Sequence, residues 1–407
     1  MENSEVEENP RRPFLKFLKW IIIPFSIAYL ISVKIDQAEL SPYVTYTFKQ
    51  HCEQDGYPYE EYSVTTDDGY ILSLYRIPGK NKNPGPPVLL VHGLSNSAHC
   101  FILNQCTTPP AFRLADENYD VWLGNNRGSH LSREHTKLDP NSHEYWDWSV
   151  AEVIEYDLPP LVKFVKEKTG YEKIGIFSHS QGSGAVLWML SLYPEMKNDV
   201  AIAILSATPG GISKPESLYI NLLASSLVHN IFDLLGMKIW SDWTDDLSFA
   251  KFIATFPTIS SWIGSDVFDM SLHGGNKELH LPVYVHRIRG GTSIKNLKFM
   301  RQYQVNSSTK PYLYDYGKEG NLKKYGKETP PTVDFKKCQT PLAVMNGKYD
   351  LVVPQKDSIL LKESLNQDML VFYKDDYEQD HGGFLMSCNM SYFDDVIRLF
   401  KSHLKLK

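Results

Sequence analysis

Short apolar runs recur along most of the chain and are separated by stretches with helical spacing. Runs of about five mostly apolar residues without regular polar alternation are typical of parallel strands buried on both faces. Such runs occur at 87–91, 119–123, 173–177, 200–206, 341–345 and 369–373. Helical patterns at about 150–168 and 181–192 lie between them. This order of strands and helices predicts an α/β fold with a mostly parallel sheet and right-handed crossovers.

Two segments depart from this rhythm. Residues 61–76 alternate around Asp67-Asp68-Gly69, which predicts a β-hairpin. Between 210 and 338 the alternation stops, and the chain is rich in Trp, Phe, Leu and Met with scattered glycine and proline. We therefore predict a helical cap at 210–338. It would be inserted into a core formed by 46–209 and 339–407, which follows a tail of 1–45. Most cap aromatics would form a second core, and a minority would line a pocket.

Composition narrows the possible functions. The 407 residues are 42% hydrophobic and carry a formal net charge of -6, and no dense Lys/Arg cluster with interleaved aromatics occurs in the folded region. Nucleic acid is therefore not an expected partner. The five cysteines form no CxxC pair, so they predict no zinc site and do not establish an oxidising compartment. With no HExxH, P-loop or dinucleotide fingerprint, we expect neither a metal nor an organic cofactor.

The N-terminal segment has the pattern of a membrane-directed sequence. An apolar run at 20–33 follows Arg11, Arg12, Lys16 and Lys19. The run has about 14 residues, fewer than the roughly 20 needed for an untilted span, and no small-x-small cleavage site follows it. We predict an uncleaved anchor with the folded domain on the lumenal or extracytoplasmic side. A removed signal, leading to secretion or a lysosome-like compartment, is the alternative. N-x-S sequons at Asn306 and Asn389 are compatible with both.

The pentapeptide Ser178-His179-Ser180-Gln181-Gly182 connects a predicted strand to a predicted helix. A serine hydroxyl becomes an exposed nucleophile at such a turn when the residues two positions away on either side are small. Ser178 replaces the usual first glycine, and Gly182 keeps the second. We interpret this turn as a nucleophile elbow with Ser180 as the nucleophile.

A serine nucleophile needs a base and an acid, which follow it in the chain order Ser, Asp, His. Asp350 lies in a turn after the predicted strand 341–345, and His381 lies in a loop after the last predicted strand. We predict that His381 accepts the serine proton and that Asp350 orients the imidazole. The competing acids are Asp375, Asp376 and Asp380.

Negative charge that develops on the substrate carbonyl oxygen requires preorganised donors. One is the backbone N–H of Gln181, directly after the nucleophile. The second is expected from the loop after the strand 87–91, with the Leu94 N–H as the favoured donor. We predict a structural role for His92 beside this loop. His179 is expected to point away from the nucleophile as a packing residue.

From about Gly56 to its C-terminus, the chain resembles the acid lipase family of α/β-hydrolases, which includes gastric lipase, lysosomal acid lipase and fungal steryl ester hydrolases. The matching segments are Gly56-Tyr57-Pro58, Asp68-Gly69-Tyr70-Ile71-Leu72, Arg76-Ile77-Pro78, His92-Gly93-Leu94, Gly124-Asn125-Asn126-Arg127-Gly128, Trp146-Asp147-Trp148-Ser149, Tyr156-Asp157-Leu158-Pro159, Ser178 to Gly182, Tyr314-Asp315-Tyr316-Gly317, and Gly347 with Asp350. The resemblance implies an α/β-hydrolase fold with an inserted helical cap. It also implies Ser180, Asp350 and His381 as the catalytic triad, and Leu94 and Gln181 as oxyanion donors.

The chain departs from the family at Ser178 and in the cap. The cysteines that bridge the cap in secreted animal members have no counterpart between 210 and 337. Together with the apolar N-terminal run, this absence makes the chain more similar to the membrane-anchored steryl ester hydrolases than to the secreted members.

We therefore expect a serine lipase or esterase that hydrolyses triacylglycerol or steryl ester through an acyl-enzyme, at a membrane or lipid-droplet surface. Two alternatives remain open. An acyltransferase would let an alcohol intercept the same acyl-enzyme, and a non-catalytic lipid-binding protein would keep the fold alone.

Overall fold

The structure is a computed structural model of the 407-residue chain. It describes residues 26, 28–79, 81, 84–210, 215–242, 246–258, 277–287, 290–305 and 311–404.

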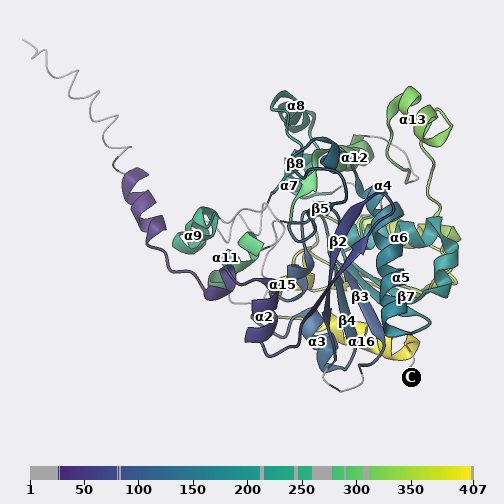
Figure 1. The fold of residues 1–407 in the computed structure, drawn as a ribbon, viewed down its shortest axis with the longest axis horizontal. Coiled ribbons are helices and arrows are strands. Elements are labelled where there is room, and N and C mark those ends of the chain that lie inside the picture. Colours follow the sequence, from purple (N-terminus) through teal and green to yellow (C-terminus); the bar gives the residue numbers. More distant parts are fainter. Residues whose placement is uncertain are drawn as a thin grey trace, which may run out of the picture.

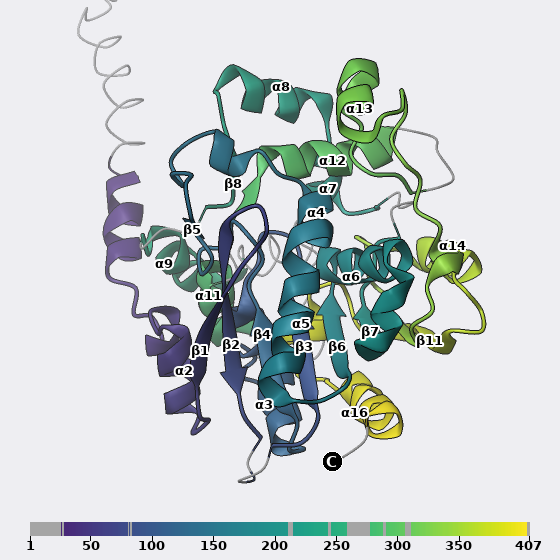
Figure 2. The same ribbon diagram turned by 45° about the vertical axis from the view of Figure 1, so that its right-hand side comes forward.

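A twisted central sheet organises the molecule (Figures 1 and 2). Its strands are β1 (Glu60–Thr65), β2 (Tyr70–Ile77), β3 (Pro87–Val91), β4 (Asp120–Gly124), β5 (Glu134–His135), β6 (Ile174–His179), β7 (Val200–Ser206), β10 (Leu342–Gly347) and β11 (Leu370–Tyr377). They lie in the order β1-β2-β4-β3-β6-β7-β10-β11, with β5 beside β2. β2 pairs antiparallel with β1, β4 and β5, and all pairs from β4 to β11 are parallel. The predicted hairpin and all six predicted strands are confirmed, and the fold is that of an α/β-hydrolase.

Helices cover both faces of this sheet. They are α2 (Phe48–Gln54), α3 (Pro110–Asp116), α4 (Val150–Glu152), α5 (Leu158–Thr169), α6 (Gln181–Leu192), α14 (Gln355–Ser364), α15 (Gly383–Met386) and α16 (Tyr392–His403). A π-helical turn at Val153–Asp157 joins α4 to α5, so the helix predicted at 150–168 is continuous but not regular.

The inner strands β3, β7 and β10 are mostly apolar because both of their faces are buried. In β3, Val88 and Leu90 belong to the core beneath α3 and α16, whereas Leu89 and Val91 belong to the core beneath α5 and α6. Successive side chains of a strand point to opposite faces, so one apolar run supplies both cores. The sheet is therefore held rigidly between two helical layers.

Mostly helical elements occupy the region predicted as a cap. They are α7 (Leu218–Leu223), α8 (Ser226–Leu234), β8 (Ile239–Trp240), α9 (Ser248–Thr255), α11 (Lys277–Arg287), β9 (Thr292–Ser293), α12 (Ile294–Val305) and α13 (Gly317–Tyr325). Both views show α7, α8, α12 and α13 grouped beyond one end of the sheet (Figures 1 and 2). The helical content agrees with the expectation, while the domain boundaries stay a prediction.

Half of the predicted membrane segment at 20–33 lies outside the described residues, as does the sequon at Asn306. Residues 28–36 are helical and expose the apolar side chains of Tyr29, Leu30 and Ile31. Among the helices that the structure describes, none combines the length and apolarity needed to cross a bilayer. The membrane anchor stays a prediction.

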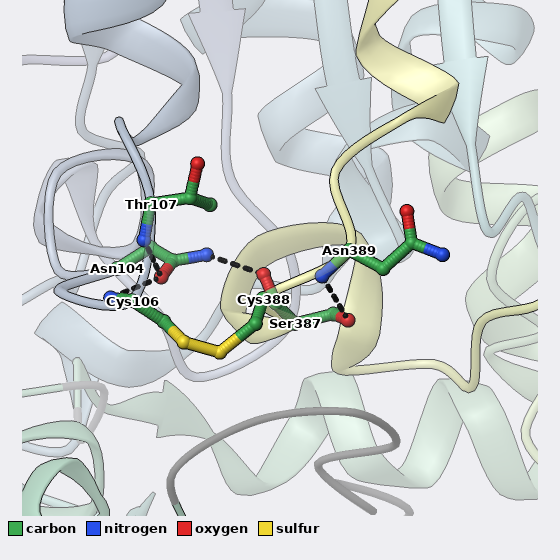
Figure 3. Close-up of a disulfide and its surroundings, with 6 residues drawn as sticks. All are labelled: Asn104, Cys106, Thr107, Ser387, Cys388 and Asn389. Carbon is green, nitrogen blue, oxygen red and sulfur yellow. Dashed lines mark hydrogen bonds between the residues drawn. A yellow bond between two sulfur atoms is a disulfide. The ribbon is translucent and has the colours of Figure 1, made fainter.

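A disulfide joins Cys106 to Cys388, whose Cα atoms are 5.1 Å apart (Figure 3). Asn104 stabilises both sides of the bridge, because its Oδ1 accepts from the Cys106 N–H (3.0 Å) and its Nδ2 donates to the Ser387 carbonyl (2.8 Å). The bridge connects the segment that follows β3 to the segment between α15 and α16. It was not predicted, since an odd number of cysteines does not specify a pairing.

Replacing both Cys106 and Cys388 by serine is expected to lower the free energy of unfolding by about 3–5 kcal/mol, because the bridge closes a very long loop in the unfolded chain. Urea unfolding monitored by fluorescence measures this loss. Dithiothreitol should destabilise the wild type by the same amount as the double substitution and leave the double variant unchanged. Equal urea midpoints for the oxidised wild type and the double variant would contradict the prediction.

Candidate active site

Three loops at the same edge of the sheet carry the predicted triad. β6 ends at His179 and α6 begins at Gln181, so Ser180 occupies the turn between them. Asp350 follows β10 by three residues, and His381 follows β11 by four. β6, β10 and β11 run parallel, so these loops leave the same edge of the sheet, where ligands bind in open α/β sheets.

The turn at Ser180 has the backbone of a nucleophile elbow. Ser180 has φ 56° and ψ -129°, a conformation that is rare for residues other than glycine and recurs at functional turns. A Cβ on Gly182 would lie 2.4 Å from the His92 carbonyl oxygen, so this position requires glycine. Ser178, in contrast, is buried in regular pairing with Leu205 on β7, and its Oγ donates to the Ile204 carbonyl at 3.4 Å. The missing first glycine therefore does not disturb the strand.

A continuous hydrogen-bonded chain links the three predicted residues. His381 Nε2 lies 2.8 Å from Ser180 Oγ, and His381 Nδ1 lies 3.1 and 3.0 Å from the two oxygens of Asp350. The buried Asp350 carboxylate also accepts from the Val352 and Val353 N–H groups, at 2.9 and 2.7 Å. A proton on Nδ1 is thereby favoured, which leaves Nε2 free to accept the serine proton.

The competing acids have other partners. Asp375 Oδ2 accepts from the Tyr373 hydroxyl at 2.7 Å, and Asp380 Oδ1 accepts from the Gly383 N–H at 2.6 Å. The exposed Asp376 lies near Lys374, with 3.9 Å between Asp376 Oδ1 and Lys374 Nζ. Asp350 is therefore the carboxylate in hydrogen-bonding contact with His381.

The predicted oxyanion loop passes directly beside the nucleophile. A Cβ on Gly93 would lie 2.8 Å from Ser180 Cβ, so only glycine allows this approach. Gln181 is the first residue of α6, where backbone N–H groups have no partner within the helix. His92 Nε2 accepts from the Asn126 N–H at 3.1 Å, and its Nδ1 donates to the Gly93 carbonyl at 2.9 Å. Burial lowers the His92 pKa to about 4, which agrees with a neutral, structural imidazole.

His179 has a contact that sequence reasoning missed. Its Nε2 donates to the His381 carbonyl at 2.9 Å, and the two ring centroids are 5.1 Å apart. Burial, and then the neighbouring His381, lowers the His179 pKa to about 3, so its ring is neutral. We expected it to point away as a packing residue, but it contacts the loop that carries the predicted base. No local sequence signal indicates this contact, because it depends on how the last loop folds back.

The predicted triad opens into a cavity of about 690 Å³. Ser180, His381, Leu94 and Gln181 lie along it, and apolar cap residues form much of its wall. These wall residues include Tyr219, Leu223, Trp240, Phe249, Val285 and Met300. Such a cavity accommodates a substrate with long apolar chains. In the part of the chain that the structure describes, no group of three or more His, Cys, Asp or Glu residues is arranged to hold a metal ion.

Comparison with known proteins agrees with the fold. A family model described as alpha/beta hydrolase fold matches residues 86–385, and one described as a partial alpha/beta-hydrolase lipase region matches 48–105. Lipase member K of Homo sapiens is 35% identical over 86% of this chain and 89% of its own length. Gastric triacylglycerol lipase of Rattus norvegicus is 32% identical over 84% and 89%, and that of Homo sapiens is 32% identical over 90% and 93%.

Identity at this level over most of both chains exceeds what a shared fold alone would give. The chain therefore belongs to the acid lipase family of α/β-hydrolases and is a carboxylic ester hydrolase that acts on lipid esters.

Proposed function

We propose that the protein is a serine lipase that hydrolyses long-chain triacylglycerol through an acyl-enzyme. The observation that carries this proposal is the hydrogen-bonded chain Ser180–His381–Asp350 beside an apolar cavity of about 690 Å³. Triacylglycerol is favoured over steryl ester because two of the relatives described above are triacylglycerol lipases by name.

The proposed cycle has two halves. Ser180 Oγ attacks the ester carbonyl carbon while His381 Nε2 takes the hydroxyl proton. The oxygen of the tetrahedral intermediate becomes negatively charged and accepts hydrogen bonds from the Leu94 and Gln181 N–H groups. His381 then gives its proton to the departing alcohol, which leaves the acyl group on Ser180. A water molecule, deprotonated by His381, attacks this ester, releases the fatty acid and restores the serine. Asp350 stabilises the imidazolium in both halves.

A lipid surface as the site of action is supported by exposed apolar residues next to the cavity. Leu227, Leu234 and Leu235 on and after α8 are 67%, 84% and 66% exposed, and Leu218 and Leu222 on α7 are also exposed. α7 contributes Tyr219 and Leu223 to the cavity wall from the same helix. Exposed apolar patches of this kind mark membrane or ligand contacts.

An oxidising, extracytoplasmic compartment is supported by the Cys106–Cys388 disulfide, because such bonds persist outside reducing compartments. This proposal includes both a secreted form and a lumenal form held by the N-terminal segment.

Labelling with a fluorophosphonate probe tests the proposed nucleophile. The wild type should form a covalent adduct at Ser180, whereas Ser180→Ala should neither label nor hydrolyse emulsified triolein. Ser241→Ala is the matched control, since Ser241 lies on the same cavity and its variant should label normally. Labelling of Ser180→Ala would overturn the serine mechanism. Faster hydrolysis of cholesteryl oleate than of triolein would replace triacylglycerol with steryl ester as the substrate.

A further inference from the structure

Both halves of the proposed oxyanion hole contact one short segment of the cap region, residues 290–296. This segment contains β9 and the first residues of α12. On one side it contacts the loop that carries Leu94, and on the other it contacts the side chain of Gln181. The two proposed donors come from loops after different strands, so a common support fixes their separation.

The contact with the first loop is made by backbone. The Gly290 N–H donates to the Ser95 carbonyl at 2.7 Å, and the Gly290 carbonyl accepts from the His130 N–H at 2.7 Å. A Cβ on Gly290 would lie 2.0 Å from the Asn96 carbonyl oxygen, so only glycine permits this approach. Ser95 itself has φ 52°, a conformation that needs support from its surroundings.

Apolar packing reinforces the same side. Leu94 packs against a cluster that contains Ile294 and Leu297, both on the first two turns of α12. The residue that offers the proposed donor is therefore held by its side chain as well as by the loop around it.

The contact with the second half is made by Asn296, which is 1% exposed. Its Nδ2 donates to Gln181 Oε1 and to Thr292 Oγ1, both at 3.0 Å, and its Oδ1 accepts from the Val150 N–H at 2.9 Å. The buried amide thus connects α6, β9 and α4 through three hydrogen bonds. A buried amide with all of these bonds made has one favourable orientation, which makes it a rigid connector.

We propose that Asn296 is a positioning residue that, together with Gly290, holds the Leu94 and Gln181 N–H groups at the separation needed by the tetrahedral intermediate. This inference rests on the proposed function, because it concerns the same oxyanion hole. It makes the cap region part of the catalytic geometry in addition to being a wall of the cavity. Donors of this kind stabilise charge only when they are fixed before the reaction begins.

The test is a double-mutant cycle with a soluble substrate, p-nitrophenyl butyrate. Asn296→Ala and Gln181→Met each remove the bond between the two side chains, and Gln181→Met keeps the backbone N–H. Each variant is expected to lower kcat about tenfold with KM changed less than twofold, a smaller loss than removal of a donor itself. The double variant should be no slower than the slower single variant, since both remove one shared interaction.

Gln302→Ala is the matched control on the same helix. Gln302 hydrogen-bonds the backbone of Asp315 through both of its amide atoms, at 2.7 and 2.9 Å. Its variant should lose stability and keep kcat. An equal loss of kcat in Gln302→Ala, or an unchanged kcat in Gln181→Met, would overturn the inference. If Asn296→Ala does not fold, Gln181→Met still tests the bond from the other side.

Ser180→Ala in the same assay separates the two proposals. Full activity in Ser180→Ala would reject the serine mechanism itself. An inactive Ser180→Ala together with wild-type kcat in Gln181→Met would reject only the positioning role of Asn296.

Discussion

Replacement of Asp350 by asparagine is expected to lower kcat for ester hydrolysis about 10⁴-fold while the protein stays folded. An asparagine can still accept from the Val352 and Val353 N–H groups, which bond Oδ1 in the wild type at 2.9 and 2.7 Å. Its amide nitrogen, however, would face His381 Nδ1 in place of a carboxylate oxygen. The imidazole would then carry its proton on Nε2, where it cannot accept the proton of Ser180.

Initial rates on p-nitrophenyl butyrate measure this loss, and circular dichroism checks the fold. Asp375→Asn is the matched control, because Asp375 was a competing acid in the sequence and instead accepts from the Tyr373 hydroxyl. Its kcat should stay within a few-fold of wild type. A fast Asp350→Asn enzyme with a slow Asp375→Asn enzyme would identify Asp375, on the last strand, as the acid of the triad.

Replacement of Arg127 by methionine is expected to lower the free energy of unfolding by about 3–5 kcal/mol, because it leaves two acidic groups without their cation. Arg127 is 2% exposed and lies over the Tyr70 ring. Its guanidinium donates to Asp68 at 2.6 and 2.9 Å, and its Nε donates to the fully buried Asp157 at 2.8 Å. Methionine fills much of the space but cannot replace these bonds.

The pH dependence of this loss provides a second readout. Burial already raises the Asp157 pKa in the wild type, and removal of Arg127 raises it further. A folded-state pKa above the unfolded value favours folding at low pH, and this contribution is lost as pH rises through the folded pKa. The loss in free energy of unfolding, measured with urea, should therefore be larger at pH 8 than at pH 5.

The control is Arg398→Met, which breaks an exposed pair with Asp395 and should cost less than about 1 kcal/mol at both pH 5 and pH 8. Equal losses of free energy of unfolding in Arg127→Met and Arg398→Met would contradict the stabilising role of Arg127.

The strands and the candidate triad were predictable because each depends on local pattern. A strand buried on both faces must be apolar at nearly every position, as β3 and β7 are. Ser180 and Asp350 follow the fully buried strands β6 and β10, and His381 follows the edge strand β11. Parallel strands bring their carboxyl ends to one edge of the sheet. The chain order of the three residues was then sufficient to propose a triad, although Ser178 breaks the usual elbow pattern.

The remaining features depend on contacts between distant segments. Asn296 and Gln181 are 115 positions apart, and Cys106 and Cys388 are 282 apart. Periodicity reports which face of an element is buried, but not which remote residue meets it. The contact of His179 with the His381 carbonyl was missed for the same reason. The fold class could thus be inferred from the sequence, whereas the contacts that hold the site in place are visible only in the three-dimensional structure.

The separation of the bridged cysteines also sets an order of events during synthesis. Cys388 follows Cys106 by 282 positions, a stretch that takes roughly 15–60 s to translate at about 5–20 residues per second. Until Cys338 appears, the other cysteines of the nascent chain are Cys52 and Cys100. Both are buried in the folded protein, at 0% and 1% exposure. If the N-terminal half packs before the chain is complete, burial of Cys52 and Cys100 would withdraw these thiols from wrong pairing and would keep Cys106 for Cys388.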